Sequence, residues 1–133
     1  NVIPVINEND AVAVAELMFT DNDELAGLIA LQLAVDAVII LTSVDGVFAG
    51  NPKDKNARVV AEIPYAEIAS FEKYLTPDKS EFSRGGMQTK FGVAKELAEK
   101  GIATHIANGL KSGVLSDILE GKSVGTKFLP QEK

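Results

Sequence analysis

The chain contains a continuous apolar run of strand length, Ala37-Val38-Ile39-Ile40-Leu41-Thr42. A run of β-branched and aliphatic residues without polar alternation is typical of a parallel strand covered on both faces. Directly before it, residues 23–34 carry apolar side chains at helical spacing. A helix followed by a buried strand is part of the repeating unit of α/β proteins. This stretch therefore predicts an α/β fold.

The same alternation of strands and helices continues on both sides of this stretch. Four further strands are expected, at residues 2–6, 59–63, 102–107 and 123–129. Three further helices are expected, one beginning at Pro64, one over residues 87–100 and one over residues 114–119. A long polar loop is expected at residues 76–84, and loops of this length often bind ligands. We therefore expect a mainly parallel sheet with helices on its faces.

Composition limits the classes of protein that the chain can belong to. Its 133 residues match one domain, and 46% apolar with 24% charged residues is a soluble, globular composition. The formal charge of −6 argues against nonspecific binding to nucleic acid. With no cysteine and one histidine, no metal site built from the protein's own side chains is predicted. The sequence shows no signal peptide or membrane-spanning run, so we expect a cytoplasmic protein without a membrane partner.

Polar clusters follow three of the expected strands. These clusters cover residues 7–10, 42–45 and 108–111. Carboxyl ends of parallel strands share one edge of a sheet, and ligands bind at that edge. A further acidic cluster, Asp21-Asn22-Asp23, precedes the first helix, and its carboxylates and amides can hold an ammonium group or orient a lysine. Turn formation and helix capping would also account for these residues, so both interpretations stay open.

A glycine-rich stretch leads into the helix expected at residues 87–100. It reads Arg84-Gly85-Gly86-Met87-Gln88-Thr89-Lys90. Two glycines allow a ligand to approach the backbone, and the start of a helix offers free N–H groups to a phosphate. Lys90 adds a positive charge that can offset charge on a transferring phosphoryl group. The stretch lacks the spacing of a Walker A motif, and a loop with a simple helix cap is the alternative.

Taken together, five stretches resemble the glutamate 5-kinases, which belong to the amino-acid kinase family. They cover residues 6–13, 21–25, 41–48, 85–90 and 113–126. The resemblance therefore implies the activity of the glutamate 5-kinases, which phosphorylate the side-chain carboxylate of glutamate with ATP in the first step of proline biosynthesis. The resemblance implies a three-layer αβα sandwich with a mainly parallel sheet, the carbamate kinase-like fold. Residues 1–133 would be the nucleotide-binding carboxyl-terminal portion of the kinase domain, a fragment expected to be inactive without the amino-terminal half.

The resemblance also implies a role for each candidate site residue. Lys90 would stabilise the transferring γ-phosphoryl group, and Asp23 would orient the lysines that face the phosphates. Glutamate would be bound by Asp10, Asn22 and Asn9. ATP, which brings Mg²⁺ with it, would contact Thr42, Ser43, Arg84, Gly85, Gly86, Met87, Gln88, Thr89 and Lys90.

Two residues depart from the pattern of the glutamate 5-kinases. Ser43 stands where many relatives carry Asp, and Arg84 stands where Thr is common.

The resemblance implies that proline is a feedback inhibitor and that the protein is a homo-oligomer. No residue pattern shows either property. Another amino-acid kinase, such as acetylglutamate kinase or aspartokinase, remains an alternative. So does a non-catalytic nucleotide-binding regulatory domain, although the presence of Lys90, Asp23 and Asp10 together argues against it.

Overall fold

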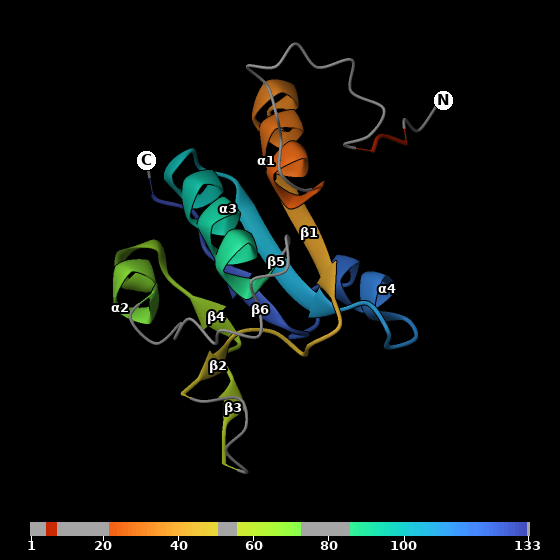
Figure 1. Cartoon of the computed structure of the whole chain (residues 1–133), viewed down its shortest axis with the longest axis vertical. Coiled ribbons are helices and arrows are strands. Elements are labelled where there is room, and N and C mark those ends of the chain that lie inside the picture. The colour runs from red at the N-terminus through yellow and green to blue at the C-terminus, as the bar shows by residue number, and fades with distance from the viewer. Residues whose placement is uncertain (1–4, 8–21, 51–55, 73–85, 133) are drawn as a thin grey trace.

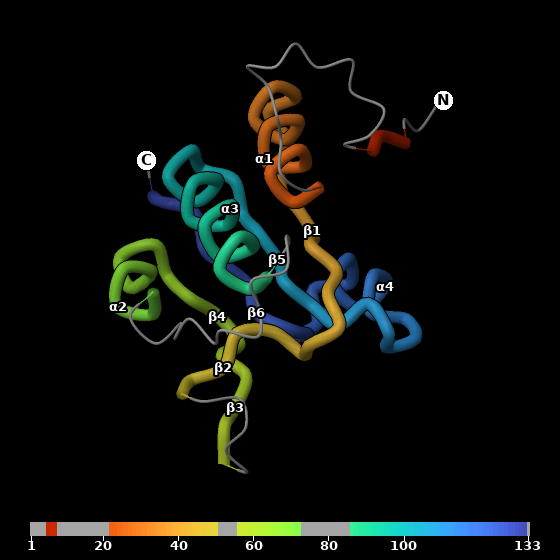
Figure 2. The backbone as a smooth tube through the Cα atoms, in the orientation of Figure 1, coloured from red at the N-terminus to blue at the C-terminus, as the bar shows by residue number. Residues whose placement is uncertain are grey.

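A computed structural model describes residues 5–7, 22–50, 56–72 and 86–132 of the chain (Figures 1 and 2). The described part is an α/β structure in which helices and short strands follow one another. The helices are α1 (Asn22–Leu33), the 3-10 helix η3 (Tyr65–Glu67), α2 (Ile68–Glu72), α3 (Met87–Glu99) and α4 (Val114–Leu119). The strands are β1 (Ala37–Thr42), β2 (Phe48–Ala49), β3 (Arg58–Val59), β4 (Glu62–Ile63), β5 (Ala103–Asn108) and β6 (Thr126–Phe128).

The main sheet has the strand order β1-β5-β6-β4. β1 and β5 are parallel, with Thr42 opposite Asn108 at their carboxyl ends. β4 and β6 are also parallel, whereas β5 and β6 are antiparallel. The expected mainly parallel sheet is confirmed, and the pair of β5 and β6 is the antiparallel exception in the described part of this sheet.

Helices cover the sheet on both faces, as the three-layer arrangement requires (Figure 1). On one face, α1, α3, η3 and α2 enclose the larger core. The rings of Phe91 from α3 and Phe128 from β6 meet there edge to face, 5.2 Å apart between centroids. On the other face, Val114 and Ile118 of α4 pack against Ala107 of β5. The alternation of side chains along β5 assigns neighbouring residues to opposite layers.

β1 is less completely covered than its continuous apolar sequence predicts. Ile40 points into the larger core and is 4% exposed, but Leu41 is 44% exposed. The reason is the shortness of α4, which reaches Ala107 and the neighbouring Ile39 but no more of this face. Coverage of both faces is therefore only partly confirmed for β1 within the described residues.

Other expected elements have mixed outcomes. The helices at α1, α3 and α4 and the strand at β1 agree with the sequence. The strand expected at residues 59–63 is instead two pieces, β3 beside β2 in a separate antiparallel pair, and β4 at the edge of the main sheet. Val5 and Ile6 form no strand, and the loop at residues 76–84 lies outside the described residues. None of the helices in the described ranges is long and apolar enough to cross a membrane.

His105 gives the fold a predicted dependence on pH. It lies in β5 beside Lys127 of β6, and burial lowers the pKa of its imidazole, as does the charge of Lys127, while Glu62 acts in the opposite direction. Below a pH of about 6.5 the unfolded chain then binds more protons than the folded one, so the free energy of unfolding should fall as pH falls. Urea titrations at pH 7.5 and 5.0 should show that the free energy of unfolding falls less between these two pH values in His105→Gln than in the wild-type protein. An equal loss in both proteins would contradict this assignment.

Candidate active site

Helices α1 and α3 bring two of the predicted site residues together. They pack side by side (Figure 1), and Gly27 permits the contact, because a Cβ there would lie only 3.0 Å from Cγ1 of Val93. Asp23 meets Lys90 one turn earlier in both helices, so the two helices run in the same direction. Each helix leads back into a parallel strand, α1 into β1 and α3 into β5. Both helices therefore begin at the edge of the sheet where those strands end.

Lys90 and Asp23 form a largely buried ion pair. The Nζ atom of Lys90 donates a hydrogen bond to Oδ2 of Asp23 over 2.5 Å, and the two side chains are 10% and 16% exposed. Removing two charges from water costs much of what their attraction returns, so such a pair contributes little net stability. A lysine held in this way has a fixed position and keeps its charge available to a nearby anion.

The start of α3 can receive an anion. Gly86 precedes the helix in an extended conformation and, because it has no side chain, cannot itself cap the first turn. Its carbonyl oxygen accepts hydrogen bonds from the N–H groups of Thr89 and Lys90, at 3.1 and 3.3 Å. The earlier N–H groups, of Met87 and Gln88, lie at the positive end of the helix dipole. Lys90 and this helix start thus place positive charge in one region.

The carboxyl ends of β1 and β5 are joined by side-chain and backbone contacts. The N–H of Gly109 donates to the carbonyl oxygen of Thr42 over 2.8 Å, which extends the pairing one residue past β5. Beyond it, Oδ1 of Asp45 accepts hydrogen bonds from Asn108 and Lys111, each at 2.8 Å. These contacts confirm that two of the three expected polar clusters meet at one edge. The third, at residues 7–10, lies mostly outside the described residues.

The other predicted site residues divide into those that the structure describes and those that it does not. Asn22 begins α1 next to Asp23 and is exposed, as are Ser43 and Gln88, while Thr42, Met87 and Thr89 are half-buried. Asn9, Asp10, Arg84 and Gly85 lie outside the described residues.

Sequence reasoning missed the contacts of Asp45. The available signal was an Asp-Gly pair after β1 and an Asn-Gly pair after the strand beside it. Both pairs mark turns, but neither identifies the partner of a turn.

The described part of the chain does not by itself supply a metal cage. Among those residues, no group of three or more histidine, cysteine, aspartate or glutamate side chains lies close enough to hold a metal ion.

The fold is that of an α/β protein, and comparison with known proteins identifies the family to which the chain belongs. The model of the amino acid kinase family matches residues 1–108, so the chain belongs to that family. Two solved structures share the fold. A carbamate kinase from Giardia lamblia, bound to AMP-PNP, is 29% identical with a TM-score of 0.65 over 84% of this chain and 36% of its own. A UMP kinase from Bacillus anthracis, at 22% identity, has a TM-score of 0.62 over 86% of this chain and 42% of its own.

Curated relatives narrow the class further. A glutamate 5-kinase from Chlorobaculum tepidum is 52% identical over 98% of this chain. A glutamate 5-kinase from Bacteroides thetaiotaomicron is 46% identical over 97% of it. The resemblance to glutamate 5-kinases that the sequence motifs suggest is confirmed. The chain spans 36% of the length of each of these two relatives.

Proposed function

We propose that the full-length polypeptide carrying this chain is a glutamate 5-kinase, and that residues 1–133 form the nucleotide-binding, carboxyl-terminal portion of its kinase domain. Identity of 52% to a glutamate 5-kinase over nearly the whole chain supports the substrate class. The observation that carries the proposal is the buried pair of Lys90 and Asp23 at the adjoining starts of α1 and α3. A lysine fixed beside a helix start suits the stabilisation of a phosphoryl group in transfer.

The reaction moves the γ-phosphoryl group of ATP to the side-chain carboxylate of glutamate. The bond between the γ-phosphorus and the oxygen that stays with ADP breaks, and a bond to a carboxylate oxygen forms. The products are ADP and glutamyl 5-phosphate, an acyl phosphate. Enzymes accelerate such transfers mainly by positioning the reactants and stabilising charge on the equatorial oxygens. Lys90 supplies a positive charge that stabilises the negative charge on these oxygens. Asp23 fixes the direction in which the ammonium group of Lys90 points.

The remaining site residues have roles consistent with their places in the chain. Thr42 and Ser43 follow β1 and are proposed to contact the adenosine, while residues 84–89 are proposed to line the phosphates. Asn22, the residue before Asp23, is proposed to bind glutamate together with Asn9 and Asp10. Its position beside the ion pair would bring the acceptor carboxylate close to Lys90. Mg²⁺ is proposed to bind the phosphates of ATP and to neutralise their charge.

The acceptor specificity provides the test of this function. Full-length protein should form hydroxylamine-trappable acyl phosphate with ATP and glutamate. Its kcat/KM for glutamate should exceed the values for N-acetylglutamate and aspartate by at least about a hundredfold, because binding groups that match one substrate leave polar groups unpaired with another. A preference for either of the other acceptors would assign the chain to a different amino-acid kinase. Nucleotide binding without any turnover would identify a regulatory domain.

Regulation and assembly follow from the same proposal. We propose that proline inhibits the full-length enzyme through the segment that contains Asp10 and Asn22, that the enzyme is a homo-oligomer, and that it acts in the cytoplasm. Adding proline to the acyl-phosphate assay should lower the rate, and glutamate should relieve the inhibition if both bind at this segment. Sedimentation of the full-length protein gives its oligomeric state.

Replacing Asp23 by Asn should lower kcat without removing ATP binding. The amide keeps the size of the side chain but loses the charge that holds the Lys90 ammonium group. Charge-assisted hydrogen bonds of this kind contribute roughly 1.5–3 kcal/mol, which corresponds to a decrease in kcat of about tenfold to a hundredfold. Steady-state kinetics with saturating ATP and glutamate measure the effect. An unchanged kcat would show that Asp23 does not position Lys90 for the reaction.

A further inference from the structure

We infer that Asp45 is a positioning residue that holds the loop after β1 in the shape needed to bind the nucleotide. The inference rests on the proposed function, because the loop begins with Thr42 and Ser43, the residues assigned to the adenosine. In this inference Asp45 does not itself contact ATP. Its effect is transmitted through the loop, which it ties to the carboxyl end of β5.

The tie from Asp45 to β5 consists of two donors on one carboxylate oxygen. Oδ1 of Asp45 accepts from Nδ2 of Asn108 and from Nζ of Lys111, both at 2.8 Å. The orientation of the Asn108 amide is fixed from its other end, since its Oδ1 accepts the N–H of Leu110 at 3.0 Å. Both donors hold the pKa of the Asp45 carboxyl below its ordinary value, the hydrogen bond from Lys111 contributing most. The carboxylate is therefore ionised across the neutral range.

The same loop is anchored on its far side to β6. Thr126 is buried, and its Oγ1 accepts the N–H of Val47 at 2.8 Å. Gly46 permits this close approach, because a Cβ there would lie 2.7 Å from Oγ1 of Thr126, and its φ of +143° suits glycine. Val47 in turn accepts the N–H of Val60 through its carbonyl oxygen, at 2.8 Å. Residues 46 and 47 are thus held through backbone and packing.

Among the described contacts of this loop, those of Asp45 are made by its side chain. The carbonyl oxygen of Thr42 is held by the N–H of Gly109, and the N–H of Val47 by Oγ1 of Thr126, so residues 43–46 form the span between these two anchors. Without the Asp45 tie, this span gains alternative conformations, and a ligand that needs one of them must meet the cost of ordering it. The cost of ordering the loop therefore weakens ATP binding. It leaves the ion pair of Lys90 and Asp23 unaffected, because that pair lies on α3 and α1.

Steady-state kinetics of Asp45→Ala in the full-length protein test the inference. The KM and the calorimetric Kd for ATP should rise about threefold to tenfold, because the bonds are partly exposed to solvent and partly screened. The kcat and the KM for glutamate should stay within about twofold of the wild-type values. Lys111→Ala, which removes one donor from an exposed position, should give a smaller rise in the same two quantities.

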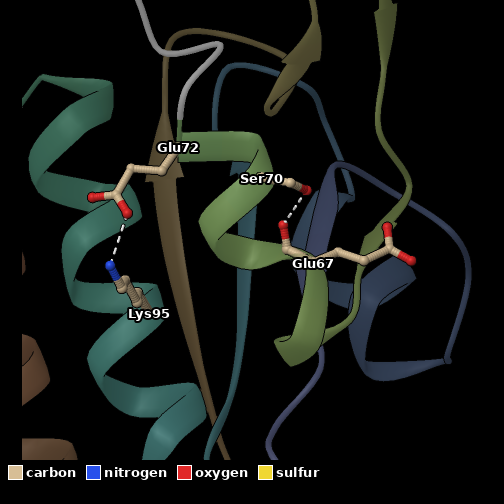
Figure 3. A network of polar contacts seen from close by, with 4 residues as sticks. All are labelled: Glu67, Ser70, Glu72 and Lys95. Atoms are coloured by element: carbon tan, nitrogen blue, oxygen red, sulfur yellow. Dashed lines mark hydrogen bonds and ion pairs between the residues drawn. The ribbon is translucent and has the colours of Figure 1, made fainter.

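A charge-swapped double variant separates positioning from general damage. In Asp45→Asn with Asn108→Asp, the amide and the carboxylate exchange places, and the new carboxylate can still accept from Leu110 and meet Lys111. The double variant should bind ATP more tightly than Asp45→Ala and close to wild type. Glu72→Ala is the matched control, since it removes an exposed 2.7 Å ion pair with Lys95 at the end of α2, away from this loop (Figure 3). It should leave the KM for ATP unchanged.

The outcomes distinguish failure of this inference from failure of the proposed function. Unchanged ATP binding in Asp45→Ala would overturn the inference. So would general damage, seen as a lower kcat, a higher KM for both substrates and a lower thermal stability. Absence of acyl-phosphate formation by the wild-type protein would instead overturn the proposed function. In that case the calorimetric Kd for ATP of Asp45→Ala and of the double variant still decides the role of Asp45.

Discussion

Replacing Lys90 by Ala is expected to lower kcat for glutamate phosphorylation by about a hundredfold to a thousandfold. Loss of one preorganised donor to a transition-state oxyanion typically costs that much. Lys90 is suited to such a role because its side chain is only 10% exposed and is fixed by Asp23 in the first turn of α3. A group held in place stabilises developing charge without the reorganisation that a mobile lysine would need. The quantity to measure is kcat at saturating ATP and glutamate.

A second lysine on the same helix provides the control for Lys90. Lys95 is 37% exposed and forms an ion pair with Glu72 across the gap between α3 and α2 (Figure 3). Next to that pair, the hydroxyl of Ser70 donates to the carbonyl oxygen of Glu67, so the short α2 turn is held locally. Lys95→Ala should change kcat by less than about twofold, as expected for a surface pair. Survival of turnover within about tenfold in Lys90→Ala would remove Lys90 from the transition state.

Replacing Phe128 by Ala should destabilise the fold by about 3–5 kcal/mol. The Phe128 side chain is fully buried, and its ring meets Phe91 of α3 edge to face. Truncation removes the transfer energy of the ring and leaves a cavity between β6 and α3. The pair with Phe91 adds about 0.5–1.5 kcal/mol beyond the buried area, which the truncated chain also loses. Urea unfolding of the full-length protein, followed through the transition that includes this region, measures the change.

The control for Phe128→Ala is a large apolar residue outside the core. Leu119 ends α4 and is 81% exposed. Leu119→Ala should therefore alter the free energy of unfolding by less than about 0.5 kcal/mol. A loss of similar size in both variants would mean that the contact between β6 and α3 is not the centre of the core.

Periodicity predicted the elements whose side chains themselves determine which face is buried. The helical spacing before β1 and the apolar side of α3 depend on residues within each segment, so the bounds of α1, α3 and α4 agree closely with the structure. Strand partners depend on distant residues, and they were not predictable. The split of residues 59–63 into β3 and β4 requires knowledge that Val60 bonds to Val47, and the direction of β6 requires knowledge of its pairing with β5.

The site was predicted to a similar degree and for a similar reason. Strand ends and a glycine-rich helix start located the edge of the sheet, and the family resemblance implied that Asp23 orients the lysines that face the phosphates. In the structure Asp23 forms an ion pair with Lys90, while the roles of both residues stay predictions. The tie between Asp45 and Asn108 was not predicted, because it joins two turns whose only relation is the register of β1 against β5.

A double-mutant cycle on Lys90 and Asp23 tests the central claim, that these two residues act as one unit in phosphoryl transfer. If Asp23 acts only through Lys90, then Asp23→Asn in the Lys90→Ala background should have little further effect on kcat. Residues that act as a unit show this strong non-additivity. The account predicts a kcat for the double variant within about twofold of Lys90→Ala alone. Multiplication of the two single effects would contradict it and would show that Asp23 and Lys90 act independently.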